Sequence, residues 1–278
     1  MSTASSKAKK QGTLGRIFKS VFLTKDVQAA NQQRLAKLTY GPVMALFVAV
    51  AAYIAANVLS VYIMSIYPLT KGWTQTQTNE WFLHSAPAQS LLLVLASCLL
   101  IAGVWWFVRR RKQTLEPMGI VRPRPRDSLY AVISFVLYFI ALAILVSFVA
   151  SAIPAVDVDQ KQEIFTAPVS GLMLILAFVP LVIIAPLTEE LLFRGFLYSG
   201  LRKKLSFWTT AVIVSAIFGS LHLSGGSSGP LWIAALDTML LSLFLCYLRE
   251  RTGSVWSGVF LHALKNLVAF IGVFVITQ

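Results

Sequence analysis

Long apolar segments are the feature of this sequence that most restricts its fold. Each is close to the roughly 20 residues that a helix needs to cross the hydrocarbon core of a bilayer. Only 13% of the 278 residues are charged and 57% are hydrophobic, which is too apolar for an ordinary soluble domain. The sequence predicts an all-α polytopic membrane protein of about seven transmembrane helices, with eight as the alternative count. The seven segments are Tyr40–Tyr67, Ala86–Val108, Ser128–Ile153, Pro168–Leu201, Phe207–Leu223, Leu231–Leu248 and Ser254–Ile276.

The basic residues predict how the chain is oriented in the membrane. A formal charge of +13 could indicate nucleic acid or acidic lipid, but Lys and Arg cluster beside apolar segments rather than on a separate domain. Alternate loops carry these clusters, at 109–112, 122–126, 202–204 and 249–251. By the positive-inside rule, we expect a multi-pass integral membrane protein with a cytoplasmic N-terminus and an external C-terminus. The expected partners are the lipid bilayer and a peptide or membrane-protein substrate, without nucleic acid; the oligomeric state is left open.

Three regions follow from these patterns. Residues 1–39 form a basic cytoplasmic region, in which Leu14, Ile17, Phe18, Val21 and Phe22 have the spacing of an amphipathic helix lying on an anionic leaflet. A disordered basic tail is the alternative interpretation. Residues 40–167 contain transmembrane helices without a recognisable motif. Residues 168–278 contain the remaining helices and every motif discussed below.

Two adjacent carboxylates, Glu189 and Glu190, lie at the end of a long apolar run. Placing each carboxylate at membrane depth costs roughly 3 kcal/mol or more, so the pair is expected to have a structural or functional role. If Leu187–Leu201 is helical, Glu190 and Arg194 share one face and neutralise each other. Glu189 lies about 100° around that helix and has no local partner. The sequence therefore predicts that Glu189 is a free carboxylate.

Two histidines and an asparagine are predicted to reach the same depth. In an antiparallel hairpin that turns between Leu205 and Ser206, Glu189 and His222 lie at equal distance from the turn. His262 and Asn266 share one face of the last segment through their i, i+4 spacing. We therefore expect an active site within the membrane, between the last four helices.

A further buried charge, Asp237, is level with Lys265 across the last predicted hairpin. A charge in this position usually needs a partner, so we interpret these residues as a structural ion pair.

A carboxylate, two imidazoles and an amide that face one another suit hydrolysis. Glu189 can take a proton from a water that His222 orients, and His262 with Asn266 can donate hydrogen bonds to the oxyanion. Zinc held by Glu189, His222 and His262 is an alternative. The sequence lacks an HExxH pair on one helix, and an asparagine suits an oxyanion better than zinc, so we expect no cofactor.

These residues also resemble the motifs of a known family, the CAAX prenyl protease type 2 and bacteriocin-processing (CPBP, Abi) intramembrane proteases. Glu189–Arg194 resembles its EExxxR motif, Phe218–His222 its FxxxH motif and His262–Asn266 its HxxxN motif. The resemblance covers about residues 168–270. It implies a glutamic-type endopeptidase in which Glu189 and His222 activate water and His262 and Asn266 form the oxyanion hole. In this comparison Glu190, Arg194 and Phe218 support the site, and 168–278 is the catalytic helical core.

Two other functions fit the same residues. One is a non-catalytic immunity or regulatory scaffold of the same family, which would keep the fold without turnover. The other is a transporter or proton relay, but the sequence has no internal repeat of the kind that many transporters show. Prenylated C-termini, leader peptides and membrane-protein segments are equally open as substrates.

Overall fold

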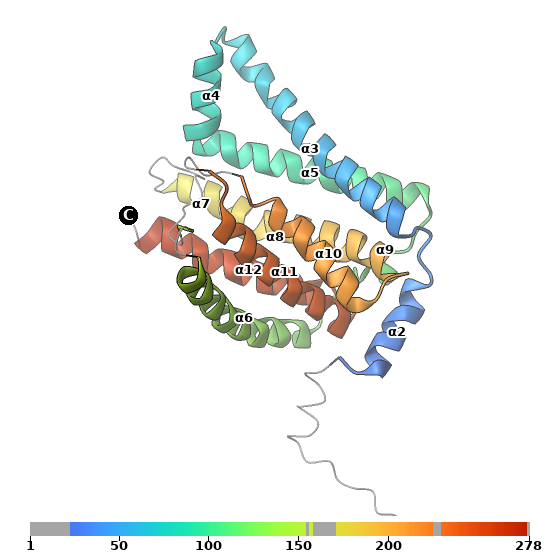
Figure 1. Ribbon diagram of the computed structural model, residues 1–278. Helices are drawn as coiled ribbons and strands as arrows, with labels where there is room; N and C mark the ends of the chain where they lie inside the picture. Colours follow the sequence, from blue (N-terminus) through green and yellow to red (C-terminus); the bar gives the residue numbers. More distant parts are fainter. Residues whose placement is uncertain (1–22, 154–155, 158–170, 225–228, 277–278) are drawn as a thin grey trace, which may run out of the picture.

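The structure, a computed structural model, describes residues 23–153, 156–157, 171–224 and 229–276. Within these ranges every regular element is a helix, as predicted. Figure 1 shows long helices packed side by side, with α2 (Lys25–Leu35) at one end and the C-terminal end of the chain at the other. The amphipathic helix predicted between Leu14 and Phe22 lies outside the described residues.

Among the described residues, six helices are long and apolar enough to cross a membrane. A seventh, α10 (Phe207–Ser220), has 14 residues and spans about 21 Å, which is less than the roughly 30 Å of a hydrocarbon core. It ends before His222, three residues short of the predicted segment. The six long spans are α3 (Pro42–Thr70), α5 (Ala86–Arg110), α6 (Pro125–Ala152), the composite stretch Leu172–Arg202, α11 (Trp232–Thr252) and Trp256–Ile276, which joins α12 (Trp256–Ile271) to η4 (Gly272–Ile276).

Local sequence signals place the helix ends. Pro42 and Pro125 lie in the first turns of α3 and α6, where a missing N–H costs nothing. The side chain of Thr74 caps α4 (Gln75–His84), and Ser206 caps α10. A short 3₁₀ turn, η1 (Glu116–Met118), lies between α5 and α6. The ends of these helices are therefore largely fixed by the sequence near them.

The composite stretch Leu172–Arg202 alternates between α-helix and π-helix. Proline interrupts it at Pro180 and Pro186, and a ring without an N–H breaks the regular hydrogen-bond ladder. π-Helical turns are often found at functional sites. In order, the segments are α7 (Leu172–Phe178), the π-helix η2 (Val179–Ile184), α8 (Ala185–Glu190), the π-helix η3 (Leu191–Leu197) and α9 (Tyr198–Arg202).

Both predicted hairpin turns are present. Helix α9 ends at Arg202 and α10 begins at Phe207, so the first turn lies where equal depth was expected. Helix α11 ends at Thr252, and the next residue, Gly253, has a left-handed backbone with φ of 68°. A glycine adopts this conformation without strain, and it reverses the chain into α12.

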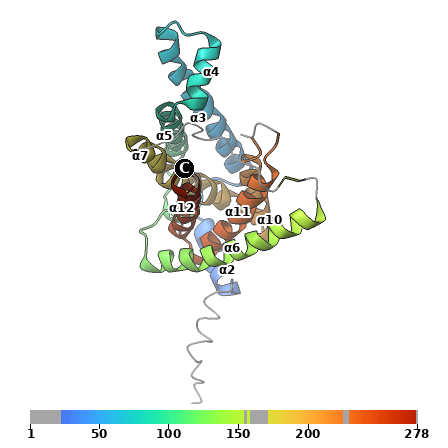
Figure 2. The same cartoon turned by 90° about the vertical axis from the view of Figure 1, so that its left-hand side faces the viewer.

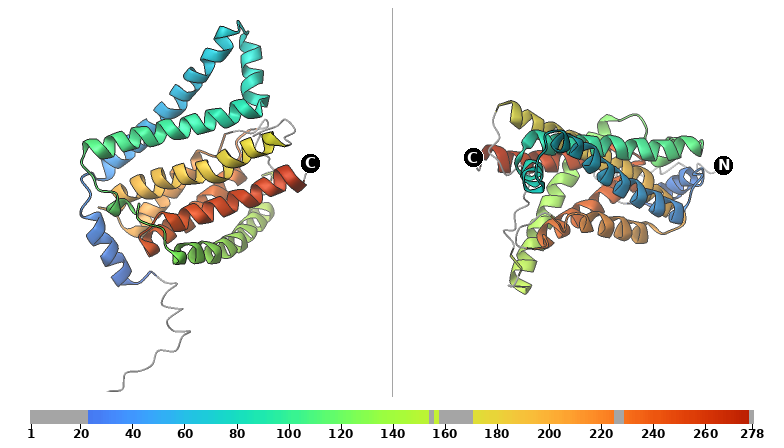
Figure 3. Two further views of the ribbon diagram at one scale, coloured as in Figure 1. Left: turned by 180° about the vertical axis from the view of Figure 1, so that it is seen from behind. Right: turned by 90° about the horizontal axis from the view of Figure 1, so that it is seen from above.

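The first two long helices form a hairpin that covers the composite stretch. Figures 1 and 3 show α3 and α5 beside α8 and α9, with α4 joining their far ends. At the near end, Tyr40 stacks on Phe196 with ring centroids 4.6 Å apart and donates a hydrogen bond to the Phe196 carbonyl. Burial raises the pKa of Tyr40, so its phenol stays a neutral donor. This contact helps to fix the hairpin against the helix that carries Glu189 and Glu190.

Helix α6 lies on the opposite side, where it contacts α11 and α12 and crosses them obliquely (Figures 2 and 3). Large apolar side chains on α3 and α6, among them Phe47, Ile140 and Phe148, are exposed. In a membrane protein such faces contact lipid rather than water.

Two arginines that we interpreted as loop charges are buried instead. Arg202 binds Glu250 at 2.9 Å, and both side chains are almost fully enclosed. Arg249 donates hydrogen bonds to the carbonyls of Arg194 and Pro117. The positive-inside pattern cannot distinguish such residues from loop charges, because they lie at helix ends next to true surface arginines.

Candidate active site

Glu190 is the carboxylate that pairs with Arg194, as predicted. Its Oε1 accepts a hydrogen bond from Arg194 at 2.8 Å, and neither residue has solvent exposure. Arg194 also donates to Ser242 of α11 at 2.6 Å, and its guanidinium lies over the Phe218 ring, 4.6 Å from the centroid. Ion pairing, hydrogen bonding and the aromatic face together compensate for burying this charge.

His262 of α12 lies between the two carboxylates. Its Nδ1 is 3.3 Å from Glu190 Oε1, and its Nε2 is 3.8 Å from Glu189 Oε2. A carboxylate is an acceptor only, so Glu190 orients the ring with the Nδ1 proton toward itself. The other nitrogen is thereby directed to Glu189.

Glu189 forms part of the wall of a pocket of about 350 Å³. Its side chain is 29% exposed, but Oε2 is buried and accepts no hydrogen bond from the described residues. A buried carboxylate oxygen without a donor is unfavourable for folding and is available to a bound molecule. The predicted free carboxylate is thus found beside a cavity large enough for part of a peptide.

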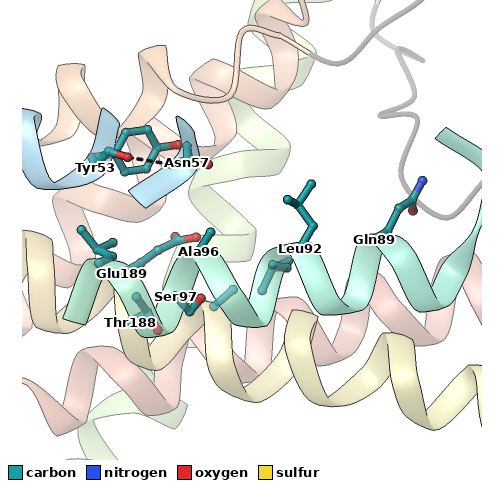
Figure 4. A pocket seen from close by; sticks show the side chains of 11 residues that line it. Tyr53, Asn57, Gln89, Leu92, Ala96, Ser97, Thr188 and Glu189 are labelled. Atoms are coloured by element: carbon teal, nitrogen blue, oxygen red, sulfur yellow. Dashed lines mark hydrogen bonds between the residues drawn. The ribbon is translucent and has the colours of Figure 1, made fainter. Parts of the chain in front are cut away.

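Figure 4 shows the other walls of this pocket, which α3 and α5 supply. We expected a site between the last four helices and assigned no role to residues 40–167. Polar residues inside apolar segments were the available signal, with Tyr53 and Asn57 four residues apart on one helix face. The lining residues are Tyr53, Asn57, Gln89, Leu92, Leu93, Ala96, Ser97, Leu100, Ala185, Thr188 and Glu189.

His222 follows the end of α10 and faces Phe218. Its Nδ1 is 2.9 Å from the Phe218 carbonyl, which can only accept, so Nδ1 carries a proton. The Phe218 ring lies between the two imidazoles, 5.1 Å from His222 and 5.8 Å from His262. His222 and Glu189 do not form a direct ion pair within 4 Å. The predicted equal depth therefore does not bring these two side chains into contact.

Asn266 donates a hydrogen bond from Nδ2 to the Leu181 carbonyl at 2.9 Å. In the π-helix η2 the N–H of Ala185 bonds to Pro180, five residues back. The same register would pair Leu181 with the N–H of residue 186, but that residue is proline and has none. The amide of Asn266 takes the place of this missing donor. It holds α12 against the turn that precedes Glu189, and its second amide hydrogen is left for another acceptor.

The predicted ion pair between the last two long helices is present. Lys265 Nζ lies 3.3 Å from Asp237 Oδ2, and the Tyr138 hydroxyl donates to the other oxygen of Asp237. Lys265 is thereby neutralised within a cluster of three helices. The cation inside the third motif thus has its own partner.

The zinc alternative requires three ligands at one point. Among the described residues, no group of three His, Cys, Asp or Glu side chains has the spacing to hold a metal ion. Glu189 and His262 approach each other, but His222 does not join them. This geometry does not fit a three-residue zinc site.

Gly258 of α12 gives a prediction about the packing of Glu190. A methyl group at this position would lie 2.5 Å from Glu190 Oε2. We expect Gly258→Ala to displace that carboxylate from Arg194 and His262, to lower the stability by about 1–3 kcal/mol and to reduce function. Thermal denaturation in detergent measures the loss of stability. The control is Gly272→Ala, since nothing lies within 4 Å of its added methyl; equal losses in both variants would contradict the prediction.

The segment that carries Glu189, His222, His262 and Asn266 is similar to known proteins. Residues 171–268 match the family described as Type II CAAX prenyl endopeptidase Rce1-like. Over 88 residues, the chain is 30% identical to the "Putative membrane peptidase YdiL" of Bacillus subtilis (strain 168), which corresponds to 30% of this chain. The alignment spans 32% of that protein, about a third of its length. No solved structure matches the chain.

The matched segment coincides with the predicted range of 168–270 and contains all three motifs. Residues 171–268 are therefore similar to the Rce1-like type II CAAX prenyl endopeptidase family.

Proposed function

We propose that the protein is an intramembrane endopeptidase that hydrolyses a peptide bond of a membrane-associated peptide or protein. The observation that carries the proposal is Glu189, whose buried Oε2 lacks a hydrogen bond at the wall of a 350 Å³ pocket, 3.8 Å from His262. The family match of residues 171–268 supports the same class of reaction.

The nucleophile in this proposal is a water bound beside Glu189. Glu189 takes one proton as the water oxygen attacks the scissile carbonyl carbon, and later gives that proton to the leaving amine. In the neutral ring of His222 the proton is on Nδ1, where the Phe218 carbonyl accepts it, so Nε2 can accept a hydrogen bond from the second hydrogen of the water. The two groups then act on one water without direct contact between them.

The oxyanion of the tetrahedral intermediate requires donors. His262, when protonated on Nε2, presents one on the side of Glu189, while Glu190 orients its ring through Nδ1. Asn266 has a second amide hydrogen besides the one that it gives to Leu181. Glu190, Arg194 and Phe218 hold the donors and the base in place.

We infer that the N-terminus is cytoplasmic, because the remaining exposed arginines gather at the end of the molecule where α2 lies. Arg109 and Arg110 lie in the last turn of α5, and Arg122 lies between η1 and α6. The chemistry proposed here uses no cofactor, and none of its steps passes through a metal.

The test is cleavage of quenched fluorescent membrane peptides by the purified full-length protein, comparing native protein with His222→Gln. We expect kcat to fall about 100-fold or more, because the water loses its second partner, while the melting temperature is unchanged. Unchanged cleavage would show that His222 is not a partner of the water and contributes only to packing. If a chelator abolishes cleavage and zinc restores it, the reaction requires zinc and the metal-free mechanism is wrong. If no peptide is cleaved and cellular function survives Glu189→Gln, the protein is the non-catalytic scaffold.

A further inference from the structure

The pocket at Glu189 continues along one face of α5 as a groove. Its lining residues on this helix recur at intervals of three or four, so they form one stripe from Gln89 to Leu100. In Figure 4 the stripe runs from the side of Glu189 past Ala96 and Leu92 to Gln89. Its length is about 16 Å at ~1.5 Å per residue, which equals an extended peptide of about five residues.

Small residues bring α3 and α5 together at one end of this groove. A Cβ added at Gly103 would lie 3.8 Å from the Cβ of Ala52, so the two helices are in van der Waals contact there. Tyr53 and Leu100, which lie next in the direction of α4, already line the pocket. Beyond them the helices diverge toward α4 (Figures 1 and 3). Two walls of the groove therefore come from helices outside the matched segment 171–268.

The α3 wall of the groove is polar, although α3 is an apolar helix. Tyr53 and Asn57 lie four residues apart and both line the pocket. Asn57 donates from Nδ2 to the Tyr53 carbonyl at 2.9 Å, which leaves its Oδ1 as an acceptor. The Tyr53 hydroxyl forms no hydrogen bond with a residue that the structure describes. This wall thus presents a hydroxyl donor and an amide acceptor to the molecule that fills the groove.

The α5 wall is mainly apolar, with Leu92, Leu93 and Ala96 at its centre. A ligand that suits both walls has polar groups along one edge and apolar side chains beside it. An extended peptide within a bilayer has this pattern, because its N–H and C=O groups need partners that lipid cannot supply. A helical peptide does not need such partners, since its backbone hydrogen bonds are internal.

The spacing of the two polar residues also suits an extended chain. Tyr53 and Asn57 are about 6 Å apart along the axis of α3, at ~1.5 Å per residue. The backbone groups on one edge of an extended peptide repeat every two residues, about 6.6 Å. One substrate carbonyl and one substrate N–H can therefore reach both side chains.

We propose that the groove between α3 and α5 binds an extended substrate segment of about five residues, and that Tyr53 and Asn57 are positioning residues for its backbone. Tyr53 donates to a substrate carbonyl, Asn57 accepts from a substrate N–H, and apolar substrate side chains pack against Leu92 and Ala96. The inference rests on the proposed function, because it places the bond to be cleaved beside Glu189. The substrate class is a membrane-associated segment that is not helical where it is cleaved.

Fluorescence anisotropy of a labelled peptide measures binding without cleavage when the full-length protein carries Glu189→Gln. The probe is a Val/Ala peptide with lysine ends, longer than the groove, in detergent. In a matched set, each central amide in turn is replaced by an ester, which removes one N–H. We expect one ester to weaken binding by about fivefold, the effect of one hydrogen bond. With Asn57→Leu added, the parent peptide should bind about fivefold more weakly, and that ester should cause no further loss.

Cleavage by the native protein gives a second readout. Tyr53→Phe should raise KM about fivefold and change kcat by less than about twofold, because it removes a binding contact and leaves the water and its base in place. The control is Tyr62→Phe, which removes the same hydroxyl from an exposed position of α3 outside the groove. It should change neither constant.

The two readouts separate this inference from the proposed function. No binding of the probe, or equal binding of the parent and every ester peptide, would overturn the groove, and the second result would indicate an apolar channel for a lipid chain. Equal KM values for Tyr53→Phe and Tyr62→Phe would remove Tyr53 from its role. If the ester and Asn57 effects are found but the native protein cleaves no peptide, the groove stands and the proposed function fails.

Discussion

Glu189→Gln should abolish peptide cleavage while leaving the fold intact. The amide keeps the shape of the side chain but cannot take the proton of the attacking water, so we expect kcat to fall by about 10²- to 10⁴-fold. Stability should change little, because Glu189 is partly exposed and its Oε2 accepts no hydrogen bond from the residues that the structure describes. The measurement is cleavage of a fluorogenic membrane peptide beside thermal denaturation of the same preparation.

The adjacent residue provides the matched control. Glu190→Gln removes a fully buried charge that Arg194 and His262 contact, so it should lower both the melting temperature and the rate. Glu80→Gln, on exposed α4, should change neither. Cleavage that persists in Glu189→Gln, or a loss equal to that in Glu190→Gln for both readouts, would remove Glu189 from its role as base.

Glu250→Leu should be the most destabilising single substitution outside the candidate active site. The carboxylate accepts hydrogen bonds from Arg202, Tyr198 and Asn31, all within 3.2 Å and all buried. Its removal leaves a guanidinium and two other donors without an acceptor, which costs about 3–5 kcal/mol. Thermal denaturation in detergent measures the loss.

An exposed acid near the same end tests whether burial is the cause. Glu116→Gln removes the partner of Arg34 in a half-exposed ion pair, and we expect a change of at most about 1 kcal/mol. The pair variant Arg202→Met, Glu250→Leu should recover part of the lost stability, because the uncompensated charge is gone. Equal melting temperatures for Glu250→Leu and Glu116→Gln would show that the buried network contributes little.

Local sequence patterns predicted the helices and their turns well. Apolar length identified the spans, and proline, serine and glycine placed several ends, because these signals act within one turn of helix. The i, i+4 spacing of Glu190 and Arg194 predicted their pairing, and equal depth predicted that of Asp237 and Lys265. In each case a charge inside an apolar segment had one suitable partner within reach.

Contacts between distant helices were predicted less well. Equal depth placed Glu189 and His222 level, but depth says nothing about rotation around the helix axis, and His262 is the imidazole nearest to Glu189. The bond from Asn266 to Leu181 depends on a π-helical register that no pattern in the sequence marks beforehand.

The sequence by itself determined that this is a helical membrane protein with a carboxylate, two histidines and an asparagine on its last segments. Residue type, spacing and hydrophobicity are properties of short stretches, and these were sufficient. Only the tertiary structure decided that α3 and α5 complete the pocket at Glu189, and that Arg202 and Arg249 are buried. Which faces of distant helices meet depends on packing across the whole bundle, where many weak contacts together fix the rotation of each helix.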